Sequence, residues 1–217
     1  MRNVGLISLG CAKNLVDSEN ILGLLSLDEF KIVSNYEDAD VIVINTCGFI
    51  ESSKKESIDT IFEVLSYGKK VVVTGCLVER YYNELKEELP EVDLFIPIRE
   101  YYHFNELLSS IFDDIPRKEL GVSDEHRLIS TGDFSAYLKI GEGCSNKCAY
   151  CAIPLIRGDF VSRKPENIIL EANKLAEEGY KELVVLQQDT TKYGIDFDNK
   201  KISIVYLLKE LLKVKSL

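Results

Sequence analysis

The sequence predicts an α/β protein with an amino-terminal doubly wound parallel sheet, followed by the first βα units of a truncated βα-barrel. Two observations support this fold class. Short apolar segments alternate with segments of helical periodicity over residues 1–112. After a polar stretch without periodicity, the alternation resumes over residues 133–217. We therefore expect two domains, at 1–112 and 133–217, joined by a linker at 113–132.

The first domain is expected to contain five strands and four helices. Its clearest strand is apolar at every position from Val41 to Ile44, which is typical of a parallel strand covered on both faces. Apolar residues at three- and four-residue steps, such as Ile58, Ile61 and Leu65, indicate the helices. The expected strands are 5–9, 31–34, 41–47, 71–76 and 93–98, and the expected helices are 14–25, 52–67, 78–89 and 101–112.

The second domain is expected to begin with a strand at 134–140 that leads directly into a cysteine-rich loop. A helix at 165–179, a strand at 182–186, a polar turn at 187–191 and a helix at 204–214 follow. In a βα-barrel the loops at the carboxyl ends of the strands carry the chemistry. Two βα units cannot close a barrel, so we expect a fragment or a truncated protein.

Composition excludes several classes of protein. The 217 residues carry a formal net charge of −10, which argues against a general nucleic-acid binder. No apolar run approaches the length of a membrane span. The apolar region at the start is too short for a signal peptide and Lys13 and Asn14 follow it at once, so we expect a cytoplasmic protein. In that reducing compartment the six cysteines are expected to be metal ligands or catalytic groups rather than disulfides.

The cysteines fall into two sets of three. Each member of the first set follows a predicted parallel strand, and the carboxyl ends of such strands lie on the edge of the sheet where ligands bind. The second set has the spacing CxxxCxxC, and three thiolates leave one position of a four-position metal site open. The first set is Cys11, Cys47 and Cys76, and the second is Cys144, Cys148 and Cys151.

Simpler interpretations of these cysteines remain open. A single cysteine is often a small buried hydrophobe, and Gly-Cys after a strand is a common turn. A zinc site is a further alternative, although structural zinc normally takes four ligands. The only histidines, His103 and His126, are expected to be solvated residues rather than ligands.

The cysteine pattern resembles that of a known enzyme family. CSNKCAYC at 144–151, after the first strand of a βα-barrel, is similar to the signature of radical S-adenosylmethionine (SAM) enzymes. Together with three upstream cysteines it resembles the methylthiotransferases. The sequence SLGCAKNLVDSE at 8–19 is closer to the branch that modifies an aspartate of a small-subunit ribosomal protein than to the tRNA-modifying branch. Further matching segments are NTCGFI at 45–50, TGCL at 74–77, GEGC at 141–144, IPLIRG at 153–158 and QDTTKYG at 188–194.

The resemblance covers the whole chain but only about the first half of a family member. It implies a methylthiotransferase domain at 1–112 and a partial radical SAM domain at 133–217. It also implies two 4Fe-4S clusters, one on each set of cysteines, with SAM bound at the open iron of the second. Tyr150 would lie beside the adenine, and Glu142, Gln188 and Asp189 near the polar groups of SAM. No side chain is expected to act as an acid or base, because the clusters carry the chemistry.

Other residues near these sites have weaker assignments. Asn45 and Thr46 are candidate hydrogen-bond donors to the first cluster, and Asn14 is a candidate donor or a helix cap. Arg157 and Arg163 are either contacts for an acidic substrate surface or solvated residues.

The expected partners are the ribosomal protein and a reductant such as flavodoxin, with no direct nucleic-acid binding and no membrane association. The alternatives are a tRNA methylthiotransferase and a non-catalytic iron–sulfur fragment.

Overall fold

The computed structural model describes residues 2–27, 30–115, 118 and 120–215. The chain forms two compact units, Met1–Leu128 and Ile129–Leu217. The first unit extends past residue 112, so that most of the stretch expected to be a linker belongs to it.

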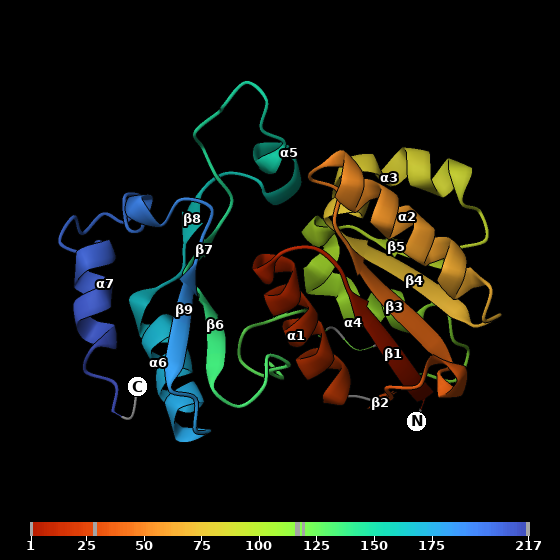
Figure 1. Ribbon diagram of the computed structural model, residues 1–217, viewed down its shortest axis with the longest axis horizontal. Coiled ribbons are helices and arrows are strands. Elements are labelled where there is room, and N and C mark those ends of the chain that lie inside the picture. The colour runs from red at the N-terminus through yellow and green to blue at the C-terminus, as the bar shows by residue number, and fades with distance from the viewer. Residues whose placement is uncertain (1, 28–29, 116–117, 119, 216–217) are drawn as a thin grey trace. The chain divides into compact units, whose positions relative to one another are not determined.

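The first unit is built on one parallel sheet (Figure 1). Its strand order is β2-β1-β3-β4-β5, and each neighbouring pair is parallel, as expected for a doubly wound sheet. The expected strand at 31–34 is shorter and begins earlier in the structure. The strands are β1 (Arg2–Ser8), β2 (Phe30–Ile32), β3 (Val41–Thr46), β4 (Lys70–Gly75) and β5 (Leu94–Ile96).

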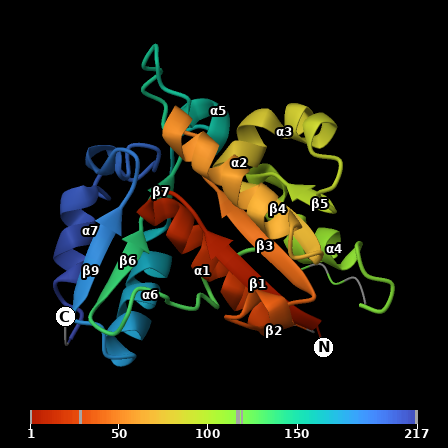
Figure 2. The ribbon, with the colours of Figure 1, turned by 45° about the vertical axis from the view of Figure 1, so that its right-hand side comes forward.

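Helices cover both faces of this sheet. Val41 and Val43 pack beneath α1 (Ala12–Ser26) and α4 (Phe104–Ser109), whereas Ile42 and Ile44 pack beneath α2 (Glu51–Leu65) and α3 (Cys76–Glu88). The alternation of side chains along β3 therefore supplies both cores, which explains why this strand is apolar throughout. Figure 2 shows α2 and α3 side by side on their face of the sheet.

The helix expected at 101–112 is divided in the structure. A 3₁₀ segment, η2 (Ile98–His103), precedes the six-residue helix α4. Apolar residues three and four positions apart fit a 3₁₀ turn as well as an α-helix, so periodicity alone could not separate the two. Another 3₁₀ segment, η1 (Tyr36–Asp38), lies between β2 and β3.

The stretch expected to be a linker is fixed to α1. Arg127 donates from Nε and a terminal nitrogen to Oε2 of Glu19 at 2.8 and 2.6 Å, and the two side chains are 3% and 0% exposed. The backbone N–H of Leu128 also donates to the carbonyl of Glu19. Polar composition suggested a solvated segment, but the polar groups of this segment have partners on the helix.

The second unit holds two parallel strands and the helices that follow them (Figure 1). β6 (Ser135–Lys139) pairs with β9 (Glu182–Leu186), and a core containing Leu138, Ile168 and Leu207 joins them to α6 (Pro165–Glu177) and α7 (Ile204–Leu211). Several short elements follow β6. The sequence did not predict them, because segments of two to five residues are too short to show a periodicity. These are the antiparallel pair β7 (Gly141–Glu142) and β8 (Val161–Ser162), and α5 (Ile153–Arg157); η3 (Thr190–Lys192) follows β9.

Among the described helices, none has the length and apolar character needed to cross a membrane.

Candidate metal centres

The first set of cysteines gathers at the carboxyl edge of the parallel sheet. Cys11 follows β1, Cys47 follows β3, and Cys76 is the residue after β4 and the first of α3. The strand order reverses between β1 and β3, and at such a switch point the connections leave to opposite faces and open a crevice. Cys47 and Cys76 are buried, and Cys11 is exposed. The set therefore lines the position where a sheet of this topology binds ligands.

Gly10 brings the Cys11 loop against Cys47. Its φ angle is +90°, in the left-handed region that glycine favours. A Cβ atom on Gly10 would lie 2.6 Å from Cβ and 3.0 Å from Sγ of Cys47. No larger residue fits this approach, so the glycine before Cys11 is required for two of the three cysteines to meet.

Gly75 has the same role on the other side of the site. Its φ angle is +94°, and a Cβ there would overlap the side-chain oxygen of Asn45 and the backbone of Thr46. The backbone just before Cys76 is thereby held against the residues just before Cys47. These two glycines explain in packing terms why Gly-Cys occurs at two of the three strand ends.

Asn14 connects all three cysteine-bearing loops. Its Nδ2 donates to the carbonyl oxygens of Leu9 at 3.0 Å and Thr46 at 2.8 Å. Its Oδ1 accepts a hydrogen bond from Sγ of Cys76 at 3.2 Å. The side chain is fully buried. The expectation that Asn14 caps the following helix is wrong, because the N-cap residue of α1 is Cys11 and Asn14 lies inside the helix.

Two serines that sequence reasoning missed support the same site. Ser57 Oγ accepts from the backbone N–H of Cys47 at 3.0 Å and donates to its carbonyl at 2.9 Å. Ser18 Oγ accepts from Nδ2 of Asn45, which also donates to the carbonyl of Asn14. Both serines are buried within helices. Each serine could have been recognised in the sequence as a polar residue on the side of its helix that faces the sheet.

The second set lies in the loop that follows β7. Cys144 is buried, Cys148 is exposed, and Cys151 lies between these extremes. The loop is tied at its start, because the N–H of Cys144 donates to the carbonyl of Gly158 at 3.1 Å. Ser145 Oγ donates to Asp159 at 3.2 Å and accepts from the N–H of Phe160 at 3.1 Å. The loop therefore has defined ends around an exposed centre.

Asp189 holds the middle of this loop. Asn146, between the first two cysteines of the set, donates from Nδ2 to Oδ2 of Asp189 at 3.0 Å. Lys192 donates to Oδ1 of the same asparagine. Hydrogen bonds from Thr191 and Asn146 lower the pKa of Asp189 below its ordinary value. The carboxylate at the end of β9 is thus engaged with the cysteine loop.

Glu142 is the centre of a second group of contacts. Its carboxylate accepts from Lys139 at 3.2 Å, Arg157 at 3.4 Å and Gln188 at 3.0 Å. These partners come from β6, the last residue of α5 and the turn after β9. The structure thus brings Glu142 and Gln188 together, two of the residues expected near SAM.

The two arginines considered for substrate contact have internal roles instead. The side chain of Arg157 is buried and pairs with Glu142. Arg163 pairs with Glu171 of α6 at 2.7 Å and also donates to the backbone carbonyl of Lys139. Arg157 pairs with the partly exposed carboxylate of Glu142, and Arg163 pairs with the buried carboxylate of Glu171. Neither arginine is therefore a solvated residue or a free contact for an acidic surface.

Gln187 is a candidate that sequence reasoning missed. Its side chain is buried beside Gly141, yet neither amide atom has a hydrogen-bond partner among the described residues. Buried polar groups are nearly always paired, so this amide is a candidate for contact with a ligand.

In the cysteine loop, Tyr150 remains 93% exposed and presents its ring to solvent.

The donor chemistry of both sets fits iron–sulfur clusters. None of the six cysteines forms a disulfide. Soft thiolates are the ligands of such clusters. In the described ranges, no three His, Cys, Asp or Glu side chains are grouped tightly enough to hold a metal ion without adjustment. His103 and His126 are exposed, and Nδ1 of His103 lies 3.7 Å from a carboxylate oxygen of Glu106 on the protein surface.

Two family models match the chain. The uncharacterized protein family UPF0004 matches residues 3–97, and the radical SAM superfamily matches residues 138–214. Two solved structures have a similar fold. They are the cobalamin-dependent SAM radical enzyme OxsB, at 12% identity and TM-score 0.63 over 99% of this chain and 37% of that one, and the radical SAM methyltransferase TsrM from Kitasatospora setae, at 14% identity and TM-score 0.61 over 97% and 51%.

Curated relatives are much more similar in sequence. Proteins named ribosomal protein uS12 methylthiotransferase RimO are 50% identical in Alkaliphilus oremlandii, 48% in Caldicellulosiruptor saccharolyticus and 49% in Clostridioides difficile. These matches cover 99 to 100% of this chain and 50 to 52% of each relative. The chain therefore spans about half the length of these relatives. It resembles the amino-terminal half of the RimO methylthiotransferases, with a UPF0004 domain followed by a radical SAM domain.

Proposed function

We propose that the chain is the cluster-bearing amino-terminal part of a radical SAM methylthiotransferase. Its substrate would be ribosomal protein uS12, and the modified atom the β-carbon of an aspartate. The observation that supports this most is the meeting of three cysteine-bearing loops at the switch point of the first unit, in a chain that also carries CxxxCxxC after β7. The relatives named RimO, at about half identity, support the choice of reaction.

Each set of cysteines would hold one 4Fe-4S cluster. Cys11, Cys47 and Cys76 would ligate the first, and Cys144, Cys148 and Cys151 the second. When bound, the clusters supply one electron to SAM and hold the sulfur that is transferred. Three protein ligands on each leave one iron open for these purposes.

The side chains around the clusters would position them and SAM. Asn14 and Ser57 fix the three loops of the first unit before the metal arrives. Tyr150 offers an exposed ring for the adenine. Gln187 has an unused donor and acceptor for the polar groups of SAM, next to the Gln188–Glu142 pair.

Charge favours a protein substrate over tRNA. Residues 1–128 contain 13 Lys and Arg against 24 Asp and Glu, a formal net charge of −11, whereas residues 129–217 contain 13 against 12. Phosphates would be repelled by the first unit, since nucleic-acid binding depends on Lys and Arg. The proposal also includes cytoplasmic location and a reductant such as flavodoxin.

Anaerobic iron and sulfide analysis tests the two clusters. We expect the chain to bind two clusters, and each triple Cys→Ala variant, one per set, to lose about half the iron, because each set ligates its own cluster. Zinc without sulfide, or the loss of all iron in one variant, would contradict separate iron–sulfur sites. For the 217-residue chain alone we expect clusters without turnover.

Mass spectrometry of cells that lack the gene tests the substrate. We expect uS12 to lose the mass of one methylthio group on an aspartate, while methylthio-adenosine in digested tRNA stays at its wild-type level. Loss of the tRNA modification with intact uS12 would identify a tRNA methylthiotransferase instead. Both modifications unchanged would favour a non-catalytic iron–sulfur protein.

A further inference from the structure

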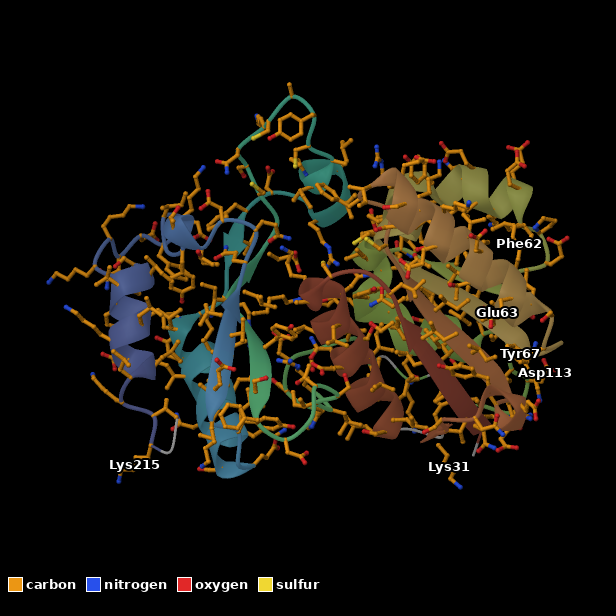
Figure 3. All side chains as sticks on the ribbon, in the orientation of Figure 1. Lys31, Phe62, Glu63, Tyr67, Asp113 and Lys215 are labelled. Atoms are coloured by element: carbon orange, nitrogen blue, oxygen red, sulfur yellow. The ribbon has the colours of Figure 1, made fainter. Side chains whose placement is uncertain are left out.

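An apolar groove of about 440 Å³ lies between α2 and α3. Ile58 and Phe62, one turn apart on α2, form one wall, and Tyr81 and Leu85 of α3 form the other. Phe62 is 56% exposed, although a phenylalanine side chain gains about 1.5–3 kcal/mol from full burial. Figure 3 labels Phe62 in the last part of α2. The groove therefore exposes apolar surface that a partner could cover.

The shape of α3 opens this groove. Tyr81 has non-helical angles, φ −129° and ψ 35°, so the helix is kinked at this residue. The ammonium of Lys54 lies 4.7 Å from the centre of the Tyr81 ring. The lysine that lines the groove is therefore already engaged in a cation–π contact.

The rim of the groove is acidic. Glu84 and Glu88, one turn apart on α3, are exposed and line it. Neither forms an ion pair with another residue in the described part of the chain. They belong to the unit whose formal net charge is −11, so the field around them attracts positive charge.

One end of the groove lies beside the first set of cysteines. Leu77, the residue after Cys76, lines it. Both helices begin at the carboxyl edge of the sheet, where α2 follows Cys47 and α3 starts at Cys76. A polypeptide that lies along the groove would thus extend toward the site where the first cluster is expected.

We propose that this groove binds a Lys- and Arg-rich segment of the protein substrate, uS12, by an apolar side chain placed between Phe62 and Tyr81. The basic side chains on either side of that anchor would pair with Glu84 and Glu88. Proteins that bind RNA are rich in Lys and Arg because they neutralise phosphates, so a ribosomal protein has the required charge. The inference rests on the proposed function and adds to it a surface for substrate binding.

This surface is tested by measuring the affinity of the chain for purified, fluorescently labelled uS12 by fluorescence anisotropy. We expect Phe62→Ala to weaken binding about tenfold, as removal of an anchoring aromatic typically does. The double variant Glu84→Lys and Glu88→Lys should weaken it at least as much, since it places like charges opposite the basic segment. All three residues are exposed, so the fold should tolerate each change.

A matched control separates the effect of net charge from the effect of the position of the substituted residues. Glu106→Lys with Asp113→Lys changes the net charge by the same amount, but on α4 and just after it, on the other face of the sheet. Binding should stay within about twofold of wild type at physiological salt, where distant charges are screened. Equal weakening in both double variants would overturn the proposal. It would also be overturned if the wild-type chain did not bind uS12, or if it bound tRNA more tightly than uS12.

The surface and the proposed function can fail separately. If uS12 is modified in cells but groove variants bind it normally, the surface is wrong and the function stands. If groove variants lose uS12 binding but cells without the gene keep uS12 modified, the surface stands and the reaction is wrong.

Discussion

Asn146 in the CxxxCxxC loop donates a hydrogen bond from Nδ2 to Oδ2 of Asp189, over 3.0 Å. The two residues are separated by 43 positions in sequence, and they connect the loop after β7 to the loop after β9. The bond links the thiolates expected to hold the second cluster with the turn that contains Gln187 and Gln188. Its donor and acceptor can be exchanged, which allows a direct test.

Asn146→Asp should reduce iron binding by the second set of cysteines, because it places two carboxylates opposite each other. We expect a loss of affinity of about 10-fold, the lower end for residues that orient metal ligands. The exchange Asn146→Asp with Asp189→Asn should restore binding, since the amide introduced at position 189 would then donate to the new carboxylate. Iron and the electron paramagnetic resonance spectrum are measured in a chain whose first set is replaced by alanine.

Asn173→Asp is the control for that exchange. Asn173 is also exposed, but its side chain bonds only within α6, to the carbonyl of Ile169. Its variant should keep the full iron content. An exchange variant no better than the single Asn146→Asp variant would show that the bond does not position the loop.

Asn14→Ala should remove the first cluster and destabilise the first unit. The buried carbonyl of Thr46 and the part-buried carbonyl of Leu9 would lose their donor, and the loss at the buried carbonyl alone costs about 1–3 kcal/mol. Iron content in a chain without the second set, and urea unfolding, measure the two effects. Asn3→Ala is the matched control, because Asn3 makes a similar bond, to the carbonyl of Asp38, from the opposite end of β1. Equal iron loss in both variants would contradict a specific role for Asn14.

Gln187→Met should leave the metal-free chain as stable as wild type or more stable. The amide it removes is buried without a partner, which costs about 1–3 kcal/mol. Binding of SAM to the reconstituted chain should weaken about tenfold, equivalent to one hydrogen bond of about 1.4 kcal/mol. Thermal unfolding and calorimetric titration with SAM provide these values. Gln188→Met differs, because it breaks a bond to Glu142 and should lower stability. Reduced stability of Gln187→Met with unchanged SAM binding would contradict the ligand role.

Arg127→Met should lower the free energy of unfolding of the first unit by about 3–5 kcal/mol, because it removes the guanidinium that lies 2.6 Å from the fully buried carboxylate of Glu19. The double variant Glu19→Met with Arg127→Met should be more stable than this single variant, since both charges of the pair are removed together. Urea unfolding of both variants measures the difference. A double variant at least as unstable as Arg127→Met would show that packing of the stretch after residue 112, rather than its charge, holds it on α1.

The sequence by itself determined the alternation of strands and helices in both units and the position of Cys11, Cys47 and Cys76 at the ends of strands. These features follow from local patterns, since an apolar run such as 41–44 and a glycine beside a cysteine act over a few residues. The β7–β8 pair and α5 were not predicted because each is too short to show a period. Periodicity likewise did not separate η2 from α4.

Only the tertiary structure decided what the polar residues do. From the sequence, Asn14 could be a helix cap, and Arg157 and Arg163 could be solvated residues. Arg127 lies in the stretch that was expected to be a linker. Each of these side chains instead pairs with groups that another part of the chain supplies, such as Thr46, Glu142, Glu171 and Glu19. Buried apolar residues recur with the period of the helix or strand that contains them, so they can be recognised in the sequence. A hydrogen bond or ion pair between residues 8 to 108 positions apart has no period, so it appears only when the fold brings its two partners together.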